Sequence, residues 1–107
     1  MKIWVDDTRD APLGYAQCRS VNEAIKTITD YELMYDKSGG KSCYKIELID
    51  LDHDAGDYGR FGGDYIKLLD WLEETGRNYP IRIHSMNSVG VENMRRIIQR
   101  NGWTEVK

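Results

Sequence analysis

The sequence predicts an α/β fold, in which one mainly parallel sheet of four or five strands carries about three helices, largely on one face. Two observations predict it. Short apolar runs suited to strands alternate with longer amphipathic stretches, and 107 residues suit a single domain spanning residues 1–107. No repeat or low-complexity tract divides the chain. In open sheets of this kind, ligands bind beyond the carboxyl ends of the strands.

Five segments are expected to form strands. Residues 45–52 (KIELIDLD) have the strongest strand pattern, and residues 2–7 (KIWVDD) form a short apolar run that ends in two acids. Residues 80–85 (PIRIHS) are entered through a proline, whereas residues 16–19 (AQCR) give only a weak signal. A last short strand is expected at residues 103–106.

Three helices are expected between these strands. The first begins after Ser20, which forms a capping box with Glu23. The second spans residues 63–74, where apolar side chains recur at helical spacing. The third is expected to be capped by Ser88 and to end before Gly102.

The link between the first two strands, Thr8 to Ala16, is too short for a helix, because a parallel crossover normally needs about a dozen residues or more. Helices are therefore expected to be missing from one face of the sheet. Side-chain alternation predicts an apolar, helix-covered face made of six residues: Ile3, Val5, Ile46, Leu48, Ile81 and Ile83. The other face is expected to be half open, covered by the Pro12–Tyr15 loop or by a second subunit in a homodimer.

Composition and charge exclude several classes of protein. The chain has 18 acidic and 15 basic side chains and a net charge of −3, which disfavours an extended nucleic-acid surface. It has no run of about 18 apolar residues and no signal-peptide pattern, so membrane insertion and secretion are not expected. Cys18 and Cys43 have neither metal-ligand spacing nor a disulfide pattern, and we interpret them as free thiols of a cytoplasmic protein.

Aspartates concentrate after two of the expected strands. Residues 6–10 and 50–57 hold Asp6, Asp7, Asp10, Asp50, Asp52, Asp54 and Asp57. Carboxylates this close together repel one another unless a cation neutralises them, and hard oxygen ligands suit Mg²⁺ or Mn²⁺. We expect such an ion to be held by Asp7 and Asp52, with Asp6 or Asp54 completing the site. The alternative is that these aspartates serve only loops and helix starts.

Both histidines of the chain also follow expected strands. His53 lies beside Asp52, and His84 lies beside Ser85. A histidine next to a carboxylate has a fixed tautomer and exchanges a proton near neutral pH. Asp52, His53 and His84 are therefore the candidate catalytic residues, and purely structural roles for the histidines are the alternative.

Four further residues are candidates for contacts with a phosphate. Ser85 and Asn87 offer hydrogen-bond donors near the start of the last helix, where free backbone amides also point outward. Helix capping is the competing explanation for this pair. Arg9 and Arg60 are candidate anion clamps, with solvated loop side chains as the alternative.

These motifs resemble the receiver domains of response regulators, in which paired acids bind Mg²⁺ and a strand-end aspartate accepts a phosphoryl group. The chain is more similar to a shortened, receiver-like family named for cyclic-phosphate processing. Nearly the whole chain carries this resemblance, through Val5-Asp6-Asp7-Thr8-Arg9, Arg19-Ser20 with Glu23-Ala24, Leu51-Asp52-His53-Asp54, Gly62-Gly63, and His84-Ser85-Met86-Asn87 with Val89-Gly90 and Glu92-Asn93-Met94. Two positions depart from the pattern: Ser88 stands in place of a proline, and Asp50 in place of a common serine.

The resemblance implies a receiver-like (flavodoxin-like) fold and a metal-dependent phosphoesterase, with Mg²⁺ or Mn²⁺ as cofactor, that processes cyclic phosphates of nucleotides or RNA ends. The alternative is a degenerate receiver that binds a phosphorylated ligand or a partner protein without catalysis. Ordinary receivers keep a lysine on the fifth strand, and here only Lys107 is available, which argues against phosphoacceptor signalling.

Overall fold

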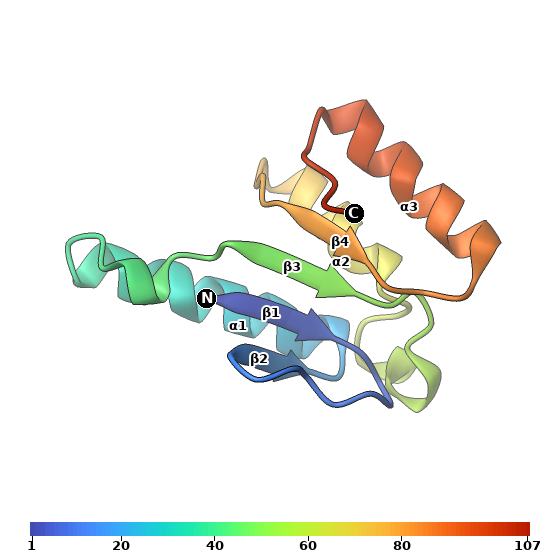
Figure 1. Ribbon diagram of the computed structural model, residues 1–107, viewed down its shortest axis with the longest axis horizontal. Coiled ribbons are helices and arrows are strands. Elements are labelled where there is room, and N and C mark those ends of the chain that lie inside the picture. The colour runs from blue at the N-terminus through green and yellow to red at the C-terminus, as the bar shows by residue number, and fades with distance from the viewer.

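Four parallel strands form one sheet in the order β2-β1-β3-β4. The computed structural model describes all residues, 1–107. The strands are β1 (Lys2–Val5), β2 (Tyr15–Cys18), β3 (Leu48–Leu51) and β4 (Ile81–Ile83), and every neighbouring pair is parallel. Figure 1 shows that they point toward the same edge of the molecule. The expected mainly parallel α/β sheet is therefore confirmed.

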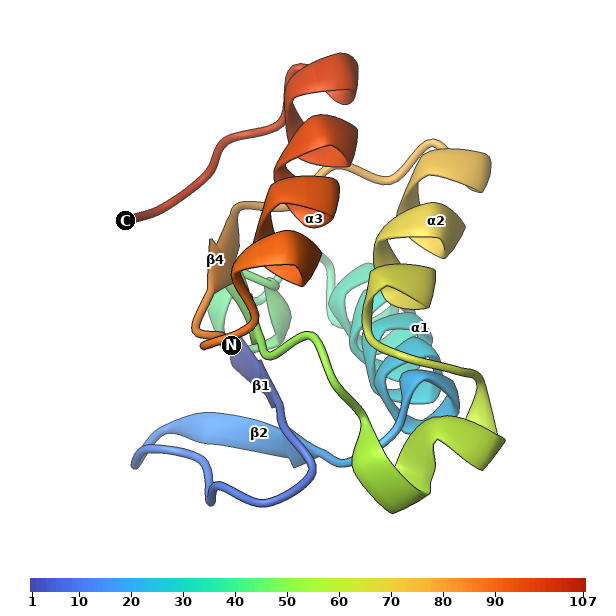
Figure 2. The ribbon, with the colours of Figure 1, turned by 90° about the vertical axis from the view of Figure 1, so that its right-hand side faces the viewer.

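Three helices cover one face of this sheet: α1 (Val21–Lys37), α2 (Ile66–Glu74) and α3 (Ser88–Asn101). In the view along the sheet in Figure 2, all three lie on the same side of the strands, as the short link between β1 and β2 predicts. Two 3₁₀ helices, η1 (Ser42–Tyr44) and η2 (Gly56–Phe61), occupy connecting segments. None of the helices is long and apolar enough to span a bilayer.

The helix starts agree only in part with the capping signals. Ser20 caps α1 as predicted, because its hydroxyl accepts a hydrogen bond from the Glu23 N–H at 3.0 Å. The cap of α3 is Asn87, whose Oδ1 accepts from the Gly90 N–H at 2.9 Å, so the prediction of Ser88 is wrong by one residue. Asparagine and serine cap helices almost equally well, and the sequence alone does not separate two adjacent candidates.

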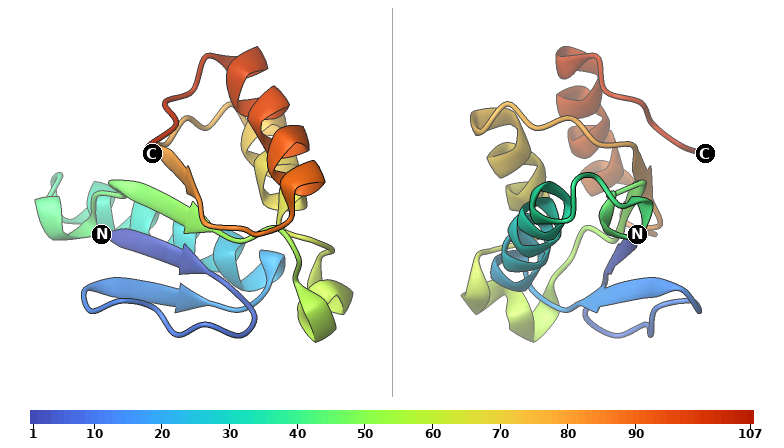
Figure 3. Two further views of the ribbon diagram at one scale, coloured as in Figure 1. Left: turned by 45° about the vertical axis from the view of Figure 1, so that its right-hand side comes forward. Right: turned by 90° about the vertical axis from the view of Figure 1, so that its left-hand side faces the viewer.

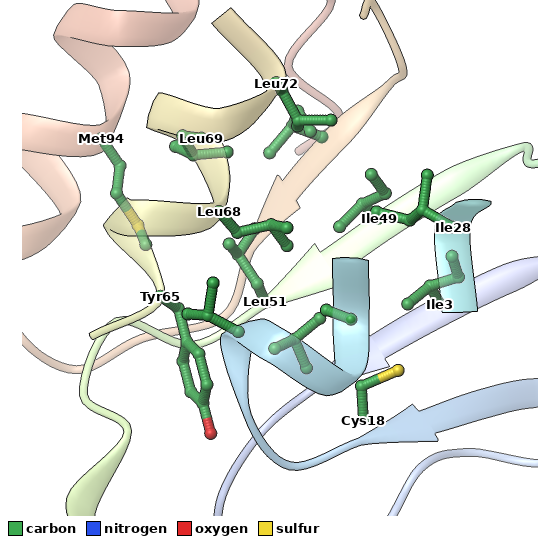
Figure 4. Packing of buried hydrophobic residues seen from close by; sticks show 14 of the residues in the cluster. Ile3, Cys18, Ile28, Ile49, Leu51, Tyr65, Leu68, Leu69, Leu72 and Met94 are labelled. Carbon is green, nitrogen blue, oxygen red and sulfur yellow. The ribbon is translucent and has the colours of Figure 1, made fainter. Parts of the chain in front are cut away.

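The core lies between the sheet and the helices. Figure 4 shows Leu51 of β3 beside Leu68 of α2, and Ile3 of β1 beside Ile28 of α1; all four belong to one buried cluster. Burial of this cluster gives the main stabilisation of the fold, at about 25 cal/mol per Å² of apolar surface.

The face predicted for β3 is wrong. The register pairs Ile3 with Ile49 and Val5 with Leu51, so the odd-numbered residues of β3 face the helices. Leu48 and Asp50 consequently face the side without helices. Ile46 is buried in the core but precedes the strand, and alternation cannot be carried from it into β3.

The chain itself covers part of the face that lacks helices. Trp4 lies on this face and is only 8% exposed. Its indole N–H donates to the Arg9 carbonyl at 3.1 Å, and the Tyr15 ring meets it edge-on with ring centroids 5.9 Å apart. Both contacts come from the segment that joins β1 to β2 and from the first residue of β2.

The C-terminal residues run beside β4, as Figure 3 shows. The strand expected at residues 103–106 is reduced to a single parallel bridge between Ile81 and Glu105. Around it, the Ile81 N–H donates to the Thr104 carbonyl at 2.9 Å and the Val106 N–H to the Ile81 carbonyl at 2.7 Å. One bridge with two hydrogen bonds is too short to continue the sheet as a fifth strand.

Candidate functional site

Backbone hydrogen bonds continue one residue beyond the strands and bring the expected site residues to one edge. The Asp6 N–H donates to the Cys18 carbonyl (3.1 Å), the Asp52 N–H to the Val5 carbonyl (2.9 Å), and the His84 N–H to the Leu51 carbonyl (3.0 Å). The residues that directly follow β1, β3 and β4 therefore lie side by side. This edge is on the right of Figure 1, where the loops after the three strands converge.

Three carboxylates meet at this edge. Asp6, Asp7 and Asp52 each offer an oxygen within 4.8 Å of the others. Burial, together with the charges of Asp6 and Asp52, raises the pKa of the Asp7 carboxyl. No lysine, arginine or histidine forms an ion pair with Asp7 or Asp52. The oxygen donors, and the unpaired charges of Asp7 and Asp52, fit a hard divalent cation.

Asp6 is the most heavily hydrogen-bonded member of this cluster. Its Oδ1 accepts from the backbone N–H groups of Thr8 and Arg9, both at 2.9 Å, and its Oδ2 faces His84 Nε2 at 2.8 Å. Burial opposes ionisation of Asp6, but these partners outweigh it and hold the pKa of Asp6 below its ordinary value. Asp7 and Asp52 are therefore better placed than Asp6 to be direct metal ligands.

Both ring nitrogens of His84 are engaged. Nδ1 lies 2.6 Å from Asp50 Oδ1, and Nε2 lies 2.8 Å from Asp6 Oδ2. The imidazole stacks on the Trp4 indole, with ring centroids 3.9 Å apart and an interplanar angle of 7°. Burial opposes protonation, but the two carboxylates outweigh it and raise the pKa of His84. The geometry therefore favours a fixed imidazolium over a mobile base.

Asp50 is a site residue that the sequence did not identify as such. Its side chain is 0% exposed, and besides His84 it accepts from Arg82 Nη1 at 3.2 Å. The wrong face assigned to β3 hid this contact, because it turned Asp50 toward the helices. The alternation of Asp50 with the apolar Ile49 and Leu51 is the signal that indicates the correct face.

His53 belongs to a second, adjoining group. Its Nδ1 lies 2.8 Å from Asp54 Oδ1, and the Asn87 amide donates to the same carboxylate oxygen at 3.2 Å. The hydrogen bond with His53, followed by that of Asn87, lowers the pKa of Asp54. Asp54 thus clusters with His53 and Asp64 and not with Asp6, Asp7 and Asp52.

The candidate phosphate contacts occupy three places. Arg9 reaches the site, where its Nη1 donates to the His84 carbonyl at 3.4 Å. Ser85 and Asn87 lie together after β4, and the Asn87 N–H donates to the Ser85 hydroxyl oxygen at 3.1 Å. Arg60 lies in η2, where its guanidinium is 4.9 Å from the centre of the Phe61 ring. The structure therefore brings Arg9, Ser85 and Asn87 to the strand ends, and places Arg60 on a loop.

Arg19 is a second residue that the candidate set omitted, although it is part of the Arg19-Ser20 motif. Its Nη1 donates to the carbonyls of Asp6 (3.2 Å) and Arg9 (3.0 Å), and its Nη2 pairs with Asp10 at 2.7 Å. The buried Tyr65 hydroxyl donates to the Arg19 carbonyl at 2.7 Å. Arg19 thus holds the loop after β1 in place beside the acids.

The comparisons with known proteins agree with this arrangement. Residues 1–100 match the family described as "Cyclic-phosphate processing Receiver domain". The comparisons with curated proteins and with solved structures returned no match. Because the match covers nearly the whole chain, and because the acids and histidines of its motifs converge at one edge of a parallel sheet, this chain belongs to the cyclic-phosphate processing receiver domain family.

Proposed function

We propose that this domain is a metal-dependent phosphoesterase that opens cyclic phosphates of nucleotides or of RNA ends. One observation carries the proposal: Asp6, Asp7 and Asp52 converge within 4.8 Å at the strand ends, beside the only two histidines of the chain. Membership of a family named for cyclic-phosphate processing supports the substrate class.

Asp7 and Asp52 would hold Mg²⁺ or Mn²⁺, with Asp6 completing the site directly or through water. When bound, such an ion polarises a phosphoryl group and lowers the pKa of water. Asp6 also orients His84, whose fixed positive charge would stabilise the negative charge that develops on the phosphate.

His53 is the better candidate for moving a proton. Its Nδ1 faces the Asp54 carboxylate, which favours the tautomer with a proton on Nδ1. Nε2 makes no hydrogen bond in the structure and is then the basic nitrogen. His53 would take a proton from the attacking water and return it to the departing ribose oxygen.

Three donors are available for the phosphate oxygens. The Ser85 hydroxyl accepts from the Asn87 N–H, so its own proton remains free to donate. The Asn87 amide and the Arg9 guanidinium lie at the same edge. Neutral and charged donors together suit an anion whose charge increases during the reaction.

The test follows a panel of 2′,3′- and 3′,5′-cyclic nucleotides by ³¹P NMR, with Mg²⁺, with Mn²⁺ and with EDTA. We expect one class of ring to open only with metal, and Asp52→Asn to abolish opening while the protein stays folded. The matched control is Asp36→Asn, which removes an exposed carboxylate that forms no ion pair. Turnover that survives EDTA or Asp52→Asn would overturn the proposed mechanism.

A binding module without catalysis is the second candidate, and the geometry of His84 favours it. With both nitrogens held by Asp50 and Asp6, His84 cannot transfer a proton unless a hydrogen bond breaks. In this case cyclic phosphates would shift the protein resonances while their own ³¹P signals stayed unchanged. A phosphoprotein formed with acetyl phosphate would instead indicate a receiver that still accepts phosphoryl groups.

A further inference from the structure

The loop between β3 and α2 carries exposed aromatic side chains. Its tip is η2, in which no residue is buried. Tyr58 is 37% exposed and Phe61 is 43% exposed, and their ring centroids lie 6.5 Å apart at an interplanar angle of 46°. The Arg60 guanidinium lies 4.9 Å from the Phe61 ring centre. Neither ring belongs to the hydrophobic core, and more than a third of each side chain is open to solvent.

Contacts at both ends fix this loop. The Ala55 N–H donates to Asp64 Oδ1 at 2.9 Å, which closes the base of the loop. Gly62 has a φ of +116° and lies so close to α1 that a Cβ there would be 2.9 Å from the Val21 Cβ. The rings are thus presented by an ordered turn, which reduces the entropy lost when a ligand binds.

The same loop touches the acid cluster. A Cβ on Gly56, the first residue of η2, would lie 2.5 Å from Asp7 Oδ2. Asp10 mainly, and Tyr58 to a smaller extent, raise the pKa of Arg19, whose guanidinium also donates to the Asp6 carbonyl. Figure 1 shows the yellow-green turn of η2 beside the loop that follows β1. The loop that carries the aromatic rings therefore borders the acid cluster.

We propose that Tyr58 and Phe61 form a platform on which the base of the substrate stacks while its cyclic phosphate lies at the acid cluster. The inference rests on the proposed function and narrows its substrate class to cyclic phosphates that carry a nucleobase. Stacking tolerates different bases, since every base has a π face. Arg60 adds a cation beside the platform. Discrimination between bases is accordingly expected to be weak.

The test compares the binding of adenosine 2′,3′-cyclic phosphate with that of glycerol 1,2-cyclic phosphate, which has no base. Titrations with Mg²⁺ are followed by ¹H–¹⁵N NMR, and the ³¹P spectrum of each sample records whether the ring stays closed. We expect the adenosine compound to bind about 5- to 150-fold more tightly, the range typical of one stacked base. Tyr58→Leu and Phe61→Leu are each expected to remove most of this difference, whereas binding of the glycerol compound stays unchanged.

Tyr35→Leu is the matched control. Tyr35 is also 37% exposed, but it lies on α1 beside Ile46 and Pro80, the residues that come before β3 and β4. A thermal melt of each variant confirms folding. Equal binding of the two probes would overturn the platform and leave the proposed function intact. The same holds if Tyr35→Leu reduces the difference in affinity between the probes as much as Tyr58→Leu and Phe61→Leu do. Binding of neither probe would overturn both, whereas base-dependent binding without ring opening would support the platform and contradict the enzyme.

Discussion

Gly90→Ala is expected to destabilise the protein, although the same change stabilises most helices. Gly90 lies in α3 and is buried against His53. An added Cβ would lie 2.5 Å from Cγ and Cδ2 of the imidazole and 2.8 Å from its Nδ1. Ordinary contacts between such atoms begin near 3.4 Å. The ring must therefore move by about 1 Å, which strains its 2.8 Å hydrogen bond with Asp54.

Two opposing contributions set the size of the effect. Alanine in place of glycine within a helix gains about 1 kcal/mol. Overpacking a buried site costs about 1–3 kcal/mol. The expected net loss in the free energy of unfolding is therefore between about 0 and 2 kcal/mol. In a His53→Ala background the obstacle is gone, and Gly90→Ala should then stabilise the protein by about 1 kcal/mol.

Urea denaturation of the four proteins in this double-mutant cycle measures both effects. Gly59→Ala is the control, because Gly59 has nothing within 4 Å of its added Cβ and is expected to change stability by less than about 0.5 kcal/mol. A Gly90→Ala variant that is stabilised equally in both backgrounds would refute the close contact. Long-range ¹H–¹⁵N spectra of the imidazole report independently whether the bond to Asp54 survives.

Three further predictions concern the core, the thiols and one ion pair. Leu69 is fully buried, and Leu69→Ala is expected to lower the free energy of unfolding, measured by urea denaturation, by about 2–5 kcal/mol. Leu13 is fully exposed, and Leu13→Ala should change it by less than about 0.5 kcal/mol. Similar losses of stability in the two variants would contradict the packing. Cys43 is exposed and should react rapidly with a disulfide reagent. Cys18 should react slowly, because burial shields its thiol from the reagent and raises its pKa to about 11. Two rapidly reacting thiols per chain would contradict the fold. Hydrogen bonds from Arg77 and then Tyr79 lower the pKa of Glu32 against the effect of burial. Its contribution to stability is therefore full above its unfolded pKa of about 4.3 and is lost as the pH falls through the lower folded pKa; an acid denaturation curve that Glu32→Gln leaves unchanged would rule this out.

The general location of the site is predictable from the sequence because it depends on topology. Strand-like runs that end in Asp6-Asp7, Asp52 and His84 must bring these residues to one edge once the strands are parallel. The convergence of Asp6, Asp7 and Asp52 follows from this rule. The absence of helices from one face follows instead from the short link between the first two strands.

The hydrogen-bond partners at the site are not predictable in the same way. A shift of one residue turns every side chain of a strand to the opposite face, and the apolar Ile46 and Leu48 favoured the wrong face for β3. The contact between Asp50 and His84 therefore could not be predicted from the sequence. The separation of Asp54 from the other acids likewise depends on side-chain contacts with His53 and Asn87, which join segments far apart in the sequence.

The link between β1 and β2 also has a consequence for the order in which the sheet assembles. Lys2 pairs with Tyr15 on one side but with Leu48 on the other, so the β1–β2 pair closes a far shorter loop than the β1–β3 pair. The entropy of loop closure favours the shorter pair by about 1 kcal/mol. We expect β1, β2 and the start of α1 to gain hydrogen-exchange protection first during refolding, with the edge that holds the acid cluster forming only when β3 docks. Simultaneous protection of β2 and β4 in pulse-labelling would contradict this order.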